Sequence, residues 1–176
     1  KKLFCLIFTL ALSFTIAYAG NVYDKYGSKT GSYRTSGSRT VTYDKYGSKT
    51  ETYKTSGSQV VKYDKYGSKT DSFRTNGSTI NQYDKYGSKT GSYRKTSNGY
   101  NSYDKYGSKT GSYRKTSSGY NSYDKYGAKT GSFKTNSNGV TTQYDKYGSK
   151  IGTFKTDSSG RTTHYDKYGR KVGSYK

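Results

Sequence analysis

The sequence predicts an all-β fold built from tandem β-hairpins of 20 or 21 residues. The pentapeptide YDKYG occurs eight times, and its first six copies follow one another at steps of 20 residues; the copies begin at Tyr23, Tyr43, Tyr63, Tyr83, Tyr103, Tyr123, Tyr144 and Tyr165. A fixed period of this length is typical of repeat architectures, in which each unit is one supersecondary element packed on its neighbours. Each unit also carries two turn signals, and the chain holds 24 tyrosines, a residue type that favours strands.

Residues 1–19 have the pattern of a secretory signal peptide. Two lysines precede an apolar stretch from Leu3 to Ile16, and small residues flank Tyr18, which predicts cleavage after Ala19. The apolar stretch is shorter than the ~20 residues that span a bilayer. We therefore expect an exported protein that is extracellular, on the cell surface or periplasmic, with no transmembrane segment after cleavage.

Residues 20–176 are expected to form a single repeat domain of eight YDKYG units, the last of them truncated. This part of the chain contains no Leu, Met, Trp, Pro or Cys, so an ordinary globular core and disulfide bonds are excluded. Low apolar content with high net charge is also the signature of disorder, and that alternative stays open. Against it, the tyrosines offer large apolar surfaces whose hydroxyl groups can remain in water.

The YDKYG motif itself predicts a turn. Asp at the first position and Gly three residues later fit a type I turn in which the Gly is left-handed and the Asp side chain caps the turn. The predicted turn residues are Asp24, Gly27, Asp44, Gly47, Asp64, Gly67, Asp84, Gly87, Asp104, Gly107, Asp124, Gly127, Asp145, Gly148, Asp166 and Gly169.

The second half of each unit supplies a second turn, at Ser36 and Gly37 in the first unit and at Asn98 and Gly99 in the fourth. Two turns imply two strands per unit, over residues 29–35 and 39–45 in the first copy. Simple alternation in the first strand places Lys29, Gly31 and Tyr33 on one face and Arg34 on the other.

Electrostatics favours one way of joining the units. A parallel β-solenoid would stack each lysine on its counterpart at the ~4.8 Å strand spacing, where like charges repel by about 1 kcal/mol even in water. An antiparallel arrangement separates these lysines by an intervening strand. We therefore predict an extended, twisted antiparallel meander of about fifteen strands, with the β-solenoid as the alternative.

The repeat YDKYGSKTGSYRTSGSRTVTYD resembles the YD repeats of RHS-type proteins, in which YDxxG recurs about every twenty residues. The resemblance covers Tyr23 to Lys176 and implies antiparallel, spiralling sheet. A fainter similarity links the chain to the cell-wall-binding repeats of choline-binding proteins, which depend on Trp.

Catalysis, metals and cofactors are not expected. After the predicted cleavage site the chain has one histidine, His164, one glutamate, Glu51, and no cysteine, so a nucleophile with its base and orienting acid cannot be assembled. We interpret His164 as an exposed spacer. The eight motif aspartates are flanked by Lys and lack the dense spacing of a calcium loop.

Basic and aromatic residues are the remaining candidates for function. Basic side chains form three columns of eight, at the third, seventh and twelfth positions of each unit. Beside tyrosines, such columns suit a polyanion that places its charges on the cations and its rings on the aromatics. The candidate residues are Lys25, Lys29, Arg34, Lys45, Lys49, Lys54, Lys65, Lys69, Arg74, Lys85, Lys89, Arg94, Tyr33, Tyr53, Tyr93 and Tyr113.

Three functions remain open at this point. The first is a secreted or cell-surface structural repeat protein, not an enzyme, that associates with anionic envelope polymers or a surface glycan; nucleic acid is a less natural partner for an exported chain. The second is a dedicated glycan- or polyanion-binding module. The third is a self-assembling fibre subunit, because an open meander leaves two strand edges free to pair. The same lysines also serve to prevent aggregation of exposed strands.

Overall fold

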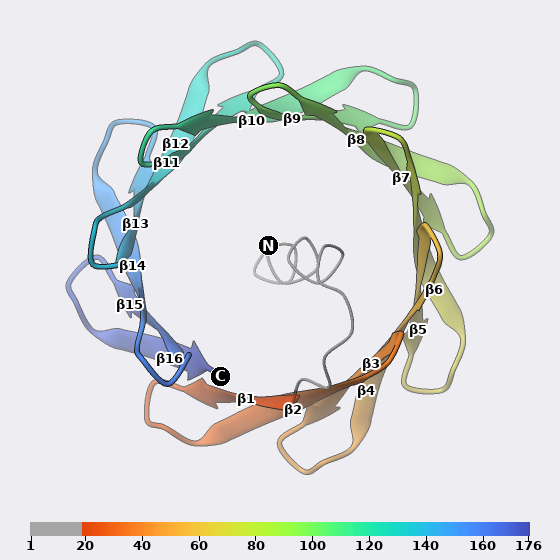
Figure 1. The fold of residues 1–176 in the computed structure, drawn as a ribbon, viewed down its shortest axis with the longest axis horizontal. Coiled ribbons are helices and arrows are strands. Elements are labelled where there is room, and N and C mark those ends of the chain that lie inside the picture. Colours follow the sequence, from red (N-terminus) through yellow and green to blue (C-terminus); the bar gives the residue numbers. More distant parts are fainter. Residues whose placement is uncertain (1–18) are drawn as a thin grey trace.

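The computed structural model describes residues 19–176, which form sixteen antiparallel β-strands closed into one barrel (Figure 1). The predicted signal peptide lies outside the described residues except for Ala19, the first residue of β1. The strands are β1 (Ala19–Asp24), β2 (Lys29–Ser36), β3 (Arg39–Asp44), β4 (Lys49–Ser56), β5 (Gln59–Asp64), β6 (Lys69–Asn76), β7 (Thr79–Asp84), β8 (Lys89–Thr96), β9 (Gly99–Asp104), β10 (Lys109–Thr116), β11 (Gly119–Asp124), β12 (Lys129–Thr135), β13 (Thr141–Asp145), β14 (Lys150–Thr156), β15 (Thr162–Asp166) and β16 (Lys171–Tyr175).

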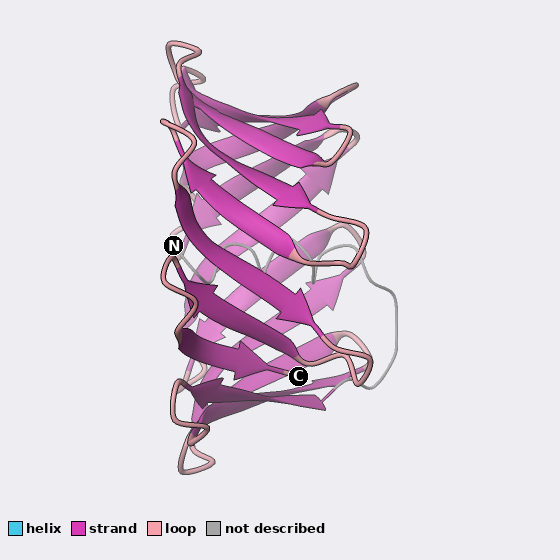
Figure 2. Ribbon diagram, turned by 90° about the vertical axis from the view of Figure 1, so that its left-hand side faces the viewer, coloured by secondary structure: helices cyan, strands magenta, loops and turns pink. Residues whose placement is uncertain are grey.

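Each strand pairs with its neighbours in sequence, and β1 pairs with β16. The prediction of an all-β chain of tandem antiparallel hairpins is confirmed, with β2 and β3 close to the expected residues 29–35 and 39–45. Because the strands alternate in direction, all YDKYG turns lie at one end of the barrel and all the second turns lie at the other (Figures 1 and 2).

The prediction of an open meander is wrong, because the chain closes. The closing pair β1–β16 has the same motif register as an internal hairpin such as β2–β3: Asp opposite Gly, the first motif Tyr opposite Ser, and the preceding residue opposite the aromatic residue. The seam pairs are Asp24↔Gly173, Tyr23↔Ser174 and Val22↔Tyr175, which match Asp44↔Gly31, Tyr43↔Ser32 and Thr42↔Tyr33. Residues 19–24 thus supply the strand that the truncated eighth unit lacks.

Closure removes the reason for expecting fibres from free sheet edges. Two backbone hydrogen bonds between Asn21 and Lys176, at 2.9 and 3.0 Å, extend the seam beyond its three register pairs. Both terminal strands of the described chain therefore have a partner strand on each side. Closure of this kind leaves no exposed strand edge with which another chain could pair.

A β-bulge in every YDKYG hairpin changes which residues share a face. In β3–β4, Tyr43 pairs with Lys49 and Thr42 pairs with Glu51, so Thr50 is the extra residue, and the other seven units shift register at the same motif position. The bulge reverses the alternation before it. Lys29 therefore lies on the face of Ser32 and Arg34, and not on the face of Tyr33 as simple alternation predicted.

The inner face of the barrel carries one aromatic residue from each even-numbered strand, β2 to β16. These eight residues form a ring around the lumen: Tyr33, Tyr53, Phe73, Tyr93, Tyr113, Phe133, Phe154 and Tyr175. His164 lies on the same face, stacked on Phe154 with ring centroids 4.5 Å apart, so it is a half-buried packing residue and not an exposed spacer.

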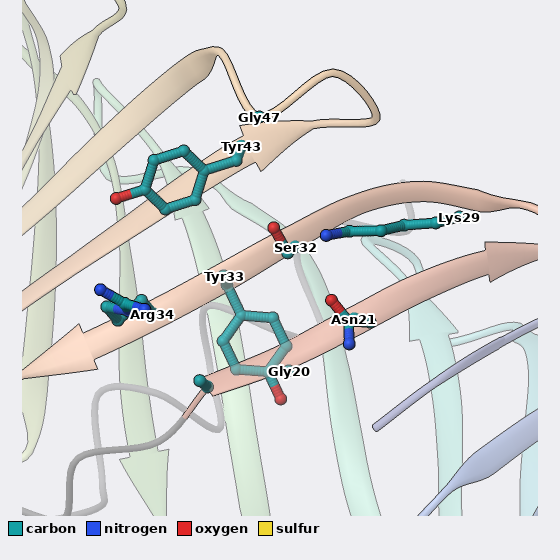
Figure 3. A pocket seen from close by; sticks show the side chains of 9 residues that line it. Gly20, Asn21, Lys29, Ser32, Tyr33, Arg34, Tyr43 and Gly47 are labelled. Carbon is teal, nitrogen blue, oxygen red and sulfur yellow. The ribbon is translucent and has the colours of Figure 1, made fainter.

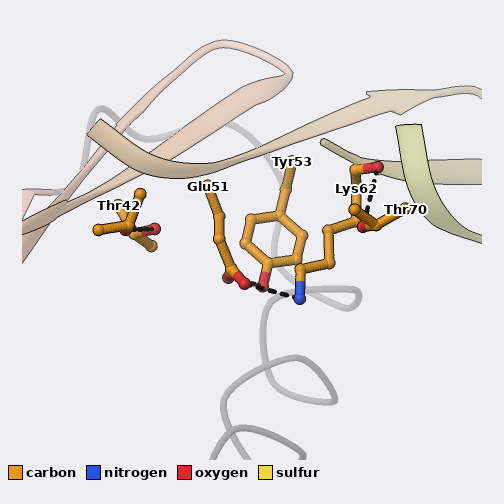
Figure 4. A network of polar contacts seen from close by, with 6 residues as sticks. Thr42, Glu51, Tyr53, Lys62 and Thr70 are labelled. Atoms are coloured by element: carbon orange, nitrogen blue, oxygen red, sulfur yellow. Dashed lines mark hydrogen bonds and ion pairs between the residues drawn. The ribbon is translucent and has the colours of Figure 1, made fainter. Parts of the chain in front are cut away.

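A small polar network also lies on the inner face (Figure 4). Tyr53 donates a hydrogen bond of 2.6 Å to Glu51 Oε2, and Lys62 Nζ lies 2.7 Å from Glu51 Oε1. Burial, followed by the hydrogen bond to Glu51, holds the pKa of Tyr53 well above its usual range. Burial, followed by the neighbouring Tyr113, also raises the pKa of Tyr93. Both inner tyrosines therefore resist ionisation.

Candidate functional site

The outer face carries a groove in which two cations flank a tyrosine (Figure 3). In the first unit the groove has a volume of about 460 Å³, and its lining includes Lys29, Ser32 and Arg34 of β2, Tyr43 of β3 and Gly47 of the following turn. Lys29 and Arg34 share a face with the Ser32 that lies between them, and Ser32 pairs with Tyr43. This set of five positions is called the wall groove below.

The wall groove recurs one unit later at the equivalent residues. A second cavity of about 120 Å³ is lined by Lys49, Thr52, Lys54, Tyr63 and Gly67, together with Arg39. The register that positions these side chains repeats around the barrel, so the sequence places the same set in every unit. The first cation of this set is a lysine in every unit, and these wall lysines are Lys29, Lys49, Lys69, Lys89, Lys109, Lys129, Lys150 and Lys171.

The floor of the wall groove holds buried hydroxyl groups. Thr52 is 4% exposed and its Oγ1 has no hydrogen-bond partner, and the same is true of the hydroxyls of Ser112 and Ser174 at the equivalent position in other units. A buried polar group normally has a partner, so these hydroxyls keep an unused capacity for hydrogen bonding beneath the groove.

In several units the second cation lies over the tyrosine ring. Lys54 Nζ is 5.2 Å from the ring centroid of Tyr63, and the guanidinium carbon of Arg114 is 4.8 Å from that of Tyr123. The contact holds the cation and the ring together as one surface, with a stabilisation of about 0.5–1 kcal/mol at such exposed positions.

Acidic side chains are absent from the outer face of the described strands. The chain has 11 acidic residues, and only two, Glu51 and Asp71, lie in mid-strand, both on the inner face. The other nine are aspartates that begin turns, so the outer face of the described strands carries the wall lysines and the second cations with no acidic side chain among them. The second cations are Arg34, Lys54, Arg74, Arg94, Arg114, Lys134, Lys155 and Lys176.

The structure separates the candidate binding residues into three places. Lys29, Lys49, Lys69, Lys89, Arg34, Lys54, Arg74 and Arg94 lie together on the outer wall. Lys25, Lys45, Lys65 and Lys85 lie in the turns at one end of the barrel. Tyr33, Tyr53, Tyr93 and Tyr113 lie on the inner face, on the opposite side of the sheet from the wall cations. Tyr33 nevertheless also lines the first groove, together with Gly20 and Asn21 of β1, whereas Tyr53 does not line the second.

Two other sets of tyrosines do lie beside cations, and the sequence reasoning missed both. The first motif tyrosine lines the wall groove, as Tyr43 and Tyr63 show. The second motif tyrosine, such as Tyr26, projects from its turn. The signal was in the sequence: both motif positions are Tyr in all eight copies, whereas Phe replaces Tyr at three of the inner positions.

The turns that carry the second tyrosine are held by their aspartates. Asp84 Oδ1 accepts hydrogen bonds from the backbone N–H groups of Tyr86, at 2.9 Å, and Ser88, at 2.8 Å, and Gly87 has a φ of 88°. The other seven motif aspartates accept the same two bonds; they are Asp24, Asp44, Asp64, Asp104, Asp124, Asp145 and Asp166.

Asp84→Ala is expected to destabilise the barrel by about 1 kcal/mol, because two backbone N–H groups lose their acceptor and exchange it for water. Asp84→Asn keeps an acceptor oxygen and should cost clearly less. Urea unfolding followed by circular dichroism measures both. Equal stability of the wild type and Asp84→Ala would show that the side chain does not hold the turn.

Within residues 19–176 no cluster of three or more His, Cys, Asp or Glu side chains could hold a metal ion. The same part of the chain contains no helix long and apolar enough to cross a membrane.

No family model and no curated protein matches this chain. Among solved structures, it is similar to BamB from Moraxella catarrhalis, with 10% identity over 84% of this chain and 80% of that one and a TM-score of 0.44. A porin-like protein from Bacteroides uniformis matches with 11% identity over 93% and 97% of the two chains and a TM-score of 0.46. An alternansucrase matches with 16% identity over 86% of this chain but 14% of its own, with a TM-score of 0.20. Function is therefore inferred from the chain's own residues.

Proposed function

We propose that this protein is an exported, non-enzymatic repeat protein of the cell surface or periplasm whose outer wall binds anionic polymers of the envelope. The observation that carries the proposal is the wall groove, which repeats two cations, a tyrosine and a buried hydroxyl around a face without acidic side chains. Sulfate, phosphate or carboxylate groups of a polymer contact the cations, and its sugar rings lie on Tyr43 and its equivalents.

The repeat spacing suits a polymer better than a small ligand. Equivalent grooves are separated by two strands, so a chain that runs around the wall meets a new pair of cations at every unit. Each contact alone is weak, but successive contacts on one polymer act at high effective concentration. Affinity is therefore expected to rise steeply with polymer length and to fall with salt, because bound cations displace counterions.

Heparin is a suitable probe polyanion for this proposal. Replacement of all eight wall lysines by Gln should weaken heparin binding about tenfold or more at roughly 0.1 M salt, and should flatten its salt dependence. The matched control replaces the eight lysines at the third motif position, such as Lys25, and removes the same charge from the end of the barrel. Isothermal titration calorimetry over a salt series measures both variants.

Equal losses in the two variants would mean that net charge alone attracts heparin and that the wall groove is not a site. No binding by the wild type at low salt would overturn the proposal itself.

A further inference from the structure

We propose that one end of the barrel is a docking surface for an anionic lipid bilayer. The surface consists of the eight YDKYG turns, called the rim. Its rim tyrosines are Tyr26, Tyr46, Tyr66, Tyr86, Tyr106, Tyr126, Tyr147 and Tyr168, and its rim lysines are Lys25, Lys45, Lys65, Lys85, Lys105, Lys125, Lys146 and Lys167. Neither set belongs to the wall groove.

The rim tyrosines are the most exposed aromatic residues of the described chain. Their side chains are 70% to 82% exposed, whereas the tyrosines of the wall groove are half-buried. Eight large rings held in water at one end of a molecule form an apolar surface of a kind that normally marks an interaction site. Tyr is also a residue enriched at the membrane–water interface, where its ring lies among the headgroups and its hydroxyl stays wet.

Each rim tyrosine is joined to a rim lysine in a fixed geometry. Lys25 Nζ lies 4.7 Å from the ring centroid of Tyr26, and the other seven pairs have the same contact at 4.7 or 4.8 Å. The capping aspartate of each turn uses Oδ1 to accept two backbone N–H groups, and this holds the pair in place. Every turn thus presents one ammonium beside one aromatic ring, which suits a phosphate headgroup above the acyl boundary.

The arrangement of the turns favours a plane over a polymer as the partner. Alternating strand direction places all eight turns at the same end, where they appear in Figure 1 as the wider loops that splay outward around the ring. A flat surface can contact all of them at once, so eight weak contacts act together. The opposite end has no such set, because its turns are built from Ser, Gly and Asn, with Asp157 in one of them, and contain no aromatic residue. The barrel would therefore stand on the bilayer by its rim, with the wall groove free.

The test is co-sedimentation of residues 20–176, the chain left after the predicted cleavage, with vesicles of phosphatidylcholine that contain about 30 mol % phosphatidylglycerol, at roughly 0.1 M salt. The decisive variant replaces the eight rim tyrosines by Ser, because it leaves the net charge unchanged and alters only exposed side chains. It should lower the partition coefficient roughly tenfold or more. A further variant replaces the rim lysines by Gln. Each such replacement should lower the partition coefficient about fivefold, the equivalent of about 1 kcal/mol per residue.

The variant with all eight wall lysines replaced by Gln is the control. It should lose heparin binding and keep most of its vesicle binding, whereas the rim tyrosine variant should do the reverse, so the two proposals can fail separately. Equal vesicle binding by the rim tyrosine variant and the wild type, or equal losses in the rim lysine and wall lysine variants, would overturn the docking surface. Binding of the wild type to heparin but not to vesicles would also overturn it, and would leave polymer as the partner of the wall alone.

Discussion

Deletion of residues 171–176 is expected to open the barrel and to make the protein self-associate. The deletion removes β16, which has four register pairs with β15 and three with β1. Each cross-strand pair stabilises a sheet by ~0.2–1 kcal/mol, so the loss of these seven pairs should lower the free energy of unfolding by roughly 1–7 kcal/mol. The larger consequence is topological, because an odd number of strands remains and β15 and β1 run in the same direction. They cannot pair in the antiparallel register that closes the full chain.

The opened barrel exposes the edges of β1 and β15, and exposed edges pair with other chains. Size-exclusion chromatography with light scattering should therefore show oligomers or aggregates, while circular dichroism still reports β-structure. Backbone amides of β1 should exchange with solvent faster than in the full chain. A deletion variant that stays monomeric, with β1 amides as protected as before, would show that closure does not depend on the seam.

The sequence contained enough information to predict the local structure. YDKYG combines an Asp acceptor with a Gly three residues later, and both act over four residues, so the turn follows from short-range chemistry alone. The strands on either side follow from the turns. The same holds for Asn98 and Gly99, except that Gly99 became the first residue of β9 and the turn moved one residue earlier. An offset of this size is usual for strand ends.

Closure could not be read from local chemistry, because it depends on how much each hairpin bends the sheet. The information was nevertheless present in residues 19–24, which match the second strand of a unit and pair with β16 in the register of an internal hairpin. The prediction of a twisted sheet pointed to curvature but not to its amount. Curvature is set by the twist of the strands and by the bulge at Thr50 and its equivalents. The repeat pattern does not predict this bulge.

The same bulge decided how much of the candidate site could be predicted. The sequence indicated three basic columns, but alternation without a bulge assigned Lys29 to the face of Tyr33. One extra residue per hairpin reverses that assignment and places Lys29 beside Arg34 and Tyr43. Tyr43 and Tyr26 belong to positions that are Tyr in all eight copies and lie beside cations, but they were not among the candidate residues.

Removal of one complete unit, residues 83–102, is expected to give a smaller closed barrel. The deletion joins Gln82 to Tyr103, so every remaining motif keeps its turn, its bulge and its neighbours. The product has fourteen strands, two fewer than the sixteen of the full chain, and its terminal strands still run antiparallel. They can pair in the register that joins Asp24 to Gly173 in the full chain. In repeat proteins each unit contacts only its neighbours, so stability should change by little more than the lost unit.

The two deletions form a matched pair, because the larger one should be tolerated and the smaller one should not. Small-angle scattering should show a monomer with a reduced radius for the variant that lacks residues 83–102, and its β1 amides should stay protected. Association like that of the variant without β16 would mean that the bend per hairpin is fixed and that only eight units can close. A closed smaller barrel would mean that strand parity and motif register control closure, and that the number of wall grooves and rim tyrosines can vary with the number of repeats.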